Sequence, residues 1–137
     1  MLASSRFVVA THVLCILARH AGKGPVCSGM IADSVETNPV VIRRLMSELE
    51  KANLVMSTAG RSGGFQLSRS ADDVSLADIY EAVEDACVFK MHQTDPDRKC
   101  PVAAQMWAAL IPKLKDAEVA MAFSLRGTKL SQIAQVA

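Results

Sequence analysis

The stretch from Cys27 to Phe65 constrains the fold of this chain more than any other part of the sequence. It predicts a short helix, a turn, a second helix that opens at Asn38-Pro39, and then a glycine-rich hairpin. Two helices around a turn, followed by a hairpin, outline a winged helix-turn-helix, which puts one helix into a DNA groove and the hairpin beside it. We therefore expect a mainly α-helical protein with a small β-hairpin wing.

Length and composition fit one domain with an appended element. The chain has 137 residues, of which 50% are hydrophobic and only 4% aromatic, and this favours a helical core of aliphatic side chains. The net charge of +1 means that any basic surface must be local. We see no signal peptide and no run of about 18 apolar residues, so we predict a cytoplasmic protein without a membrane span.

The second helix of the module should carry the DNA-reading surface. Its apolar stripe is predicted to contain Val41, Leu45 and Leu49, with Ile42 and Met46 beside it. Base readout needs polar or cationic side chains near a helix N-terminus, and a wing needs a cation and small residues at its tip. The candidate DNA-binding residues are Ser28, Asn38, Pro39, Val40, Arg43, Arg44, Ser47, Arg61, Ser62 and Gly63.

Ordinary structural roles could also explain these residues. Arg43 and Arg44 alone would be read as ordinary solvated charges, and Arg61 as the exposed residue of a surface turn. Ser28 is also expected to cap the short helix that starts there. The order of the elements around these residues is what favours DNA binding.

Two more helices flank the module in the sequence. Ser4 or Ser5 is expected to cap a first helix that runs to about His20, and Ser75 with Asp78 resembles a capping box that opens another helix after the hairpin. The predicted strands lie at residues 54–57 and 65–67.

A long last helix should begin at Pro101 and end at Gly127, with a kink at Pro112 and a short tail helix that Thr128 caps. Its apolar residues recur every three or four positions from Val102 to Leu125. This stripe either packs on the core of its own chain or forms a dimer interface. We favour the dimer, because helix-turn-helix proteins usually pair to bind two half-sites about 34 Å apart.

From Ser4 to Glu84 the chain resembles the winged-helix regulators of the Rrf-two family. The segments that carry the likeness are SSRFVVATHVL, IADSVETNPVVIRRLMSELEKANLV and GRSGGFQLSRSADDVSLADIYEAVE, and CPVAAQMW at the start of the last helix resembles one branch of the family. The resemblance implies a homodimer in which the long helices cross near a cysteine-bearing loop. It also implies an arginine just before the first wing glycine, where this chain has Ala59, so that Arg61 would take over the groove contact.

The sensor is less well specified than the DNA surface. Family members that hold an iron–sulfur cluster have three clustered cysteines in the loop, whereas this chain has Cys87 and Cys100, which resemble the outer two. A cluster would need help from His92, Asp95, Asp97 or a partner subunit. A redox pair would need the two Cα atoms within about 7 Å. The third interpretation is that both thiols are reduced and have no role. The sequence does not identify a metal.

The expected organisation is a DNA-binding domain at residues 1–84, a sensor loop at 85–100, and a dimerisation helix with its tail at 101–137. The expected function is a dimeric, sequence-specific DNA-binding transcriptional regulator, acting as a repressor. An alternative is a protein-interaction module that binds a metabolic enzyme. A small thiol enzyme is disfavoured because the sequence offers no obvious catalytic base beside Cys87 or Cys100.

Overall fold

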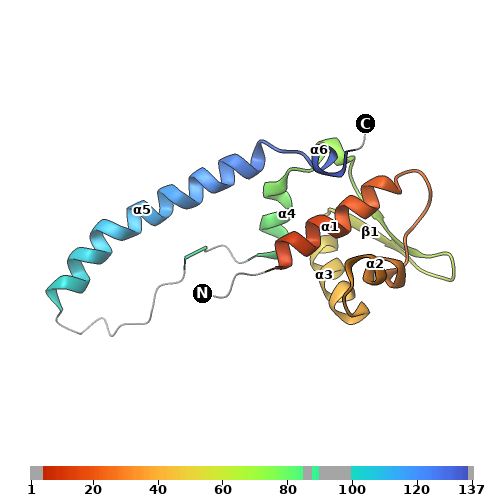
Figure 1. The fold of residues 1–137 in the computed structure, drawn as a ribbon, viewed down its shortest axis with the longest axis horizontal. Helices are drawn as coiled ribbons and strands as arrows, with labels where there is room; N and C mark the ends of the chain where they lie inside the picture. The colour runs from red at the N-terminus through yellow and green to blue at the C-terminus, as the bar shows by residue number, and fades with distance from the viewer. Residues whose placement is uncertain (1–4, 85–87, 90–99, 136–137) are drawn as a thin grey trace.

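The computed structural model describes residues 5–84, 88–89 and 100–135. Helices α1 to α4 and the hairpin form one body. The long helix α5 projects from it, with its N-terminal end far from the body and its C-terminal end near α6, which packs on the body (Figure 1). The expected mainly helical fold with a hairpin wing and a long C-terminal helix is confirmed. The elements are α1 (Arg6–Arg19), α2 (Ser28–Val35), α3 (Pro39–Lys51), β1 (Val55–Thr58), β2 (Gly64–Leu67), the 3₁₀ turn η1 (Ala71–Asp73), α4 (Leu76–Val83), α5 (Pro101–Arg126) and α6 (Leu130–Ala134).

The core of the body lies where one apolar stripe from each of α1 to α4 meets the others. Leu14 and Leu17 of α1 are buried among residues of the other helices, and Leu54 and Val55 extend the core to the base of the hairpin. Helical periodicity explains this arrangement, since residues three and four apart share one face. The buried residues of α2, α3 and α4 are Ile31, Ala32, Ile42, Leu45, Met46, Leu49, Ala77, Ile79 and Val83.

The prediction that Val41 belongs to the buried stripe of α3 is wrong. Val41 is 51% exposed, whereas Ile42 and Met46, which were placed beside the stripe, are fully buried. A strict four-residue repeat drifts by about 40° per step around a helix with 3.6 residues per turn. The repeat that includes Leu45 and Leu49 therefore leaves the core at Val41.

The hairpin pairs β1 with β2 in antiparallel register, with Val55 opposite Leu67 and Thr58 opposite Gly64. Its second strand is also tied to the segment before α2, because Val26 and Phe65 exchange backbone hydrogen bonds of 2.9 and 2.8 Å. Gly64 permits this contact, since a side chain at that position would collide with the Val26 carbonyl group. The wing is thereby fixed to the start of the helix-turn-helix.

No side chain of α5 is fully buried in this chain, although several, including Trp107 and Leu114, are half-buried. Pro112 lies inside it without interrupting it, although proline removes the N–H that would bond to the carbonyl of the residue four positions earlier. Beyond α5, the Leu130 N–H donates to the Val74 carbonyl at 2.7 Å, so α6 packs back on the body with Leu130 fully buried. In the part of the chain that the structure describes, no helix is long and apolar enough to cross a membrane.

Three capping predictions have clear outcomes. The box at Ser75 and Asp78 is confirmed, with both reciprocal hydrogen bonds present. Ser28 is the first residue of α2 and not its cap, because the extended backbone that marks a cap position lies at Cys27. The cap position of α6 is likewise Lys129 and not Thr128.

Candidate nucleic-acid interface

The N-terminus of α3 is built by Asn38 and Pro39. The Asn38 side chain accepts a hydrogen bond from the Val40 N–H at 2.8 Å, and Pro39 takes the first helical position, where a missing N–H costs nothing. Both features were predicted from the sequence. They give the helix a sharply defined start at the surface of the body.

The outward face of α3 carries the residues expected to read DNA. Val40, Arg43, Arg44 and Ser47 are exposed, on the side opposite the buried stripe. The Arg43 Nε donates to the Pro39 carbonyl at 3.4 Å, which lays the start of its guanidinium group along the first turn. A polar, cationic face at a helix N-terminus is what major-groove recognition requires.

The tip of the wing is exposed to solvent. Ala59 to Ser62 are exposed, and Arg61 supplies the cation expected at the tip. The Gly63 N–H donates to the Gly60 carbonyl at 3.1 Å, and a side chain at Gly63 would collide with the Thr58 carbonyl. At the base, the Ser57 hydroxyl donates to Glu50 of α3 at 2.8 Å. This bond orients the wing relative to α3, the candidate recognition helix.

The α1 N-terminus also belongs to this surface, although no local feature of the sequence indicates it. Arg6 pairs with Glu48 of α3, and the Phe7 N–H donates to a Glu84 carboxylate oxygen at 3.1 Å. Between α1 and α3 lies a hollow of about 290 Å³ that includes Arg6, Arg44 and Val41 in its lining. No local signal could reveal these contacts, because the partners lie 42 and 77 residues apart.

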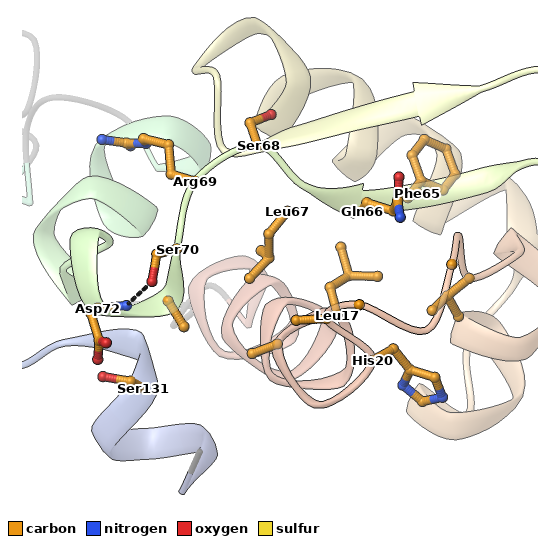
Figure 2. A pocket seen from close by; sticks show the side chains of 16 residues that line it. Leu17, His20, Phe65, Gln66, Leu67, Ser68, Arg69, Ser70, Asp72 and Ser131 are labelled. Atoms are coloured by element: carbon orange, nitrogen blue, oxygen red, sulfur yellow. Dashed lines mark hydrogen bonds between the residues drawn. The ribbon is translucent and has the colours of Figure 1, made fainter. Parts of the chain in front are cut away.

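A separate hollow of about 490 Å³ lies at the base of the wing, between α1, β2, η1 and α6. Figure 2 shows Leu17 and Leu67 on its apolar side and Ser70, Asp72 and Ser131 gathered where η1 meets α6. The Ser70 hydroxyl accepts from the Asp72 N–H at 3.3 Å, which caps the 3₁₀ turn. The Ser70 hydroxyl therefore organises the local backbone in this corner.

The described cysteines occupy three different environments. Cys15 packs against the core from α1, and burial raises the pKa of its thiol, although the nearby Arg19 acts in the opposite direction. The raised pKa favours the protonated thiol. Cys27 is exposed at the cap position of α2, and Cys100 is exposed at the cap position of α5. Cys87 and His92 lie outside the described residues.

The described residues do not form a site for an iron–sulfur cluster. Within residues 5–84, 88–89 and 100–135, no three His, Cys, Asp or Glu side chains gather closely enough to hold a metal ion. Cys100 is the one loop cysteine in these ranges. A cluster usually takes four thiolates, and the described residues do not bring such a set together.

Fold and surface together define a winged helix-turn-helix with a long appended helix. The chain matches the Rrf2 family, described as iron-dependent transcriptional regulators, over residues 3–136. It is 36% identical to YwnA of Bacillus subtilis (strain 168), named as an HTH-type transcriptional regulator, over 95% of both chains. The chain therefore belongs to the Rrf2 family of transcriptional regulators, as its resemblance to the Rrf-two family implied.

Other relatives support the same placement. The chain is 33% identical to IscR of Sodalis glossinidius over 70 residues, which span 51% of this chain and 42% of that protein. Its fold matches T. potens IscR over 98% of this chain and 87% of that chain, with a TM-score of 0.71 and 23% identity. It matches CymR of B. subtilis over 98% and 97% with the same TM-score and identity, and at that identity the likeness shows the fold alone.

Proposed function

We propose that this member of the Rrf2 family is a homodimeric, sequence-specific DNA-binding repressor. The observation that carries the proposal is the exposed, cationic outward face of α3 together with the exposed tip of the wing. Arg43 and Arg44 are exposed on a helix whose N-terminus is capped by Asn38, and Arg61 lies at the exposed end of the hairpin. In this arrangement α3 enters the major groove, while Arg61 enters or flanks the adjacent minor groove.

The dimer is proposed from the state of α5. Large apolar side chains along this helix face solvent in the single chain, among them Val102 at 72%, Val119 at 69% and Phe123 at 80% exposure. Large exposed apolar surfaces mark interaction sites in soluble proteins, so a second copy of the helix is the occupant we propose. A groove of about 620 Å³ between α4 and α5, partly lined by Val119, adjoins the same surface.

The signal is proposed to act at residues 85–100, where Cys87, His92 and Cys100 are close in sequence. Purification without oxygen, followed by a visible spectrum and assays of iron and acid-labile sulfide, separates the sensor types. Matched iron and sulfide would support a cluster and direct attention to His92 as a replacement ligand. A colourless, metal-free protein would favour a thiol switch, which Cys87→Ser and Cys100→Ser in a DNA-binding assay would test.

The alternative function is that of a protein-interaction module that binds a metabolic enzyme. The exposed apolar face of α5 favours this reading as well as the dimer, because a helix from another protein can cover such a face. Under this reading, the arginines of α3 and the wing have no role in affinity. Their substitution therefore discriminates between the two functions.

The test of the proposed function starts from duplexes with a random central segment, selected with the full-length protein. We expect enrichment of a two-fold symmetric sequence with half-sites about one helical turn, or a multiple of a turn, apart. On that duplex, Arg43→Ala should weaken specific binding by about 1–3 kcal/mol if it makes a bidentate base contact. Lys51→Ala is the matched control, because this cation lies in the last turn of the same helix. Absence of enrichment, or unchanged affinity of Arg43→Ala, would contradict this assignment.

A further inference from the structure

Val40 stands at the centre of the outward face of α3. It is nine positions before Leu49, which places the two side chains about 180° apart on a helix with 3.6 residues per turn. Leu49 is fully buried and Val40 is 55% exposed. Val40 also lies in the first turn, whose residues reach furthest into a groove when a recognition helix docks.

An apolar side chain at this point has a limited range of partners on DNA. Valine can neither donate nor accept a hydrogen bond, so it satisfies no polar group on a base edge. The C5-methyl group of thymine is the one apolar group that a base pair presents in the major groove. Arg43 and Arg44 follow Val40 by three and four positions and therefore flank it on the same face, where they attract the phosphate backbone.

We propose that Val40 reads thymine through its C5-methyl group, so that each half-site carries an A·T pair at one fixed position. The inference rests on the proposed DNA-binding function and names one determinant of its specificity. Val41 is nearly as exposed, but it lies about 100° further round the helix. There it lines the hollow beside Arg6 and Val9 of α1, away from the centre of the outward face.

The test replaces the thymine by deoxyuridine, which removes the methyl group and leaves base pairing intact. The duplex is the one selected from the random library with the full-length protein, and the fixed A·T pairs of its half-sites are exchanged for A·U one position at a time. At the contacted position we expect wild-type affinity to fall about fourfold per half-site, the value for one methyl group removed from an apolar contact.

Two variants locate the contact. Val40→Ala retains a good helix former at an exposed position, so it should fold normally, bind the thymine duplex more weakly, and no longer distinguish thymine from deoxyuridine. Val41→Ala is the matched control and should keep the full wild-type discrimination. The measurement is a double-mutant cycle over protein and DNA, which isolates the pairwise coupling.

Three outcomes would overturn the inference while leaving the proposed function intact. The first is an enriched operator without a fixed A·T pair in each half-site. The second is equal affinity of the wild-type protein for the thymine and deoxyuridine duplexes at every position. The third is that Val41→Ala, and not Val40→Ala, loses the discrimination between thymine and deoxyuridine. Failure to enrich any sequence would instead refute the proposed function itself.

Discussion

Glu36 adopts a left-handed backbone conformation, with φ of 58°, where α2 ends and the turn toward α3 begins. The Thr37 N–H then donates to the Ala32 carbonyl at 3.1 Å, which closes the end of the helix. Asn53 has the same φ of 58° at the end of α3. Asparagine tolerates this conformation much better than glutamate, because its short polar side chain can bond locally to the backbone.

At the residue scale, we expect Glu36→Asn to raise the free energy of unfolding by about 0.5–1 kcal/mol, as the strain of a left-handed glutamate is relieved. Chemical denaturation monitored by circular dichroism measures the change. The reciprocal variant Asn53→Glu introduces the same strain at the matched position and should lower stability by a similar amount. A destabilised Glu36→Asn would show that the glutamate side chain has a structural role of its own.

At the element scale, the start of α1 depends on a residue from the other end of the body. Ser5 stands at the cap position but makes no side-chain hydrogen bond to the helix. The Glu84 carboxylate instead accepts the Phe7 N–H, and the edge of the Tyr80 ring packs against Phe7 beside it. A negative charge at a helix N-terminus is also favoured by the helix dipole.

We therefore expect Glu84→Ala to lower the free energy of unfolding by about 1 kcal/mol, the usual effect of a lost N-terminal cap. The control is Glu81→Ala, three positions earlier on α4, where the glutamate pairs with Arg126 at 3.7 Å and both side chains are largely exposed. Exposed pairs of this kind contribute little, so Glu81→Ala should be close to neutral. Equal effects of the two variants in urea denaturation would refute the capping role of Glu84.

The elements differ in how far the sequence predicts them. The Asn38 cap, Pro39 and the Ser75–Asp78 box are local signals within a few residues, and the structure contains all three. The contacts of Arg6 and Glu84 join residues far apart in the chain, so only the folded arrangement reveals them. Val41 was misplaced because a four-residue repeat approximates the helical period too loosely to fix the edge of a stripe.

At the scale of the whole molecule, α5 is the element that a single chain leaves unsatisfied. Its 26 residues span about 39 Å at 1.5 Å per residue, longer than the separation of two adjacent half-sites. Pairing of two copies would cover its apolar side chains and hold two α3 helices at a fixed distance. The apolar spacing predicted a stripe that packs either on the core of its own chain or on a second copy, and the sequence alone does not distinguish the two.

We expect the wild-type protein to have twice the 14.7 kDa mass of one chain in light scattering after gel filtration. The double variant Val119→Asp with Phe123→Asp should be monomeric, because it places charges in the apolar strip of the proposed interface. Val8→Asp with Met30→Asp is the control, because it places charges at two exposed apolar residues of α1 and α2, away from α5, and it should remain dimeric. A monomeric wild-type protein, or dimeric double variant, would contradict the role proposed for α5.

The salt dependence of binding to the selected duplex tests the central claim most directly. If the outward face of α3 and the wing bind DNA, the logarithm of the association constant should fall linearly with the logarithm of the salt concentration, with a slope of about −0.9 for each phosphate neutralised. Arg61→Ala should make this slope shallower by about one unit for each copy that loses a phosphate contact. A slope near zero, with Arg61→Ala identical to wild type, would mean that this surface does not bind DNA.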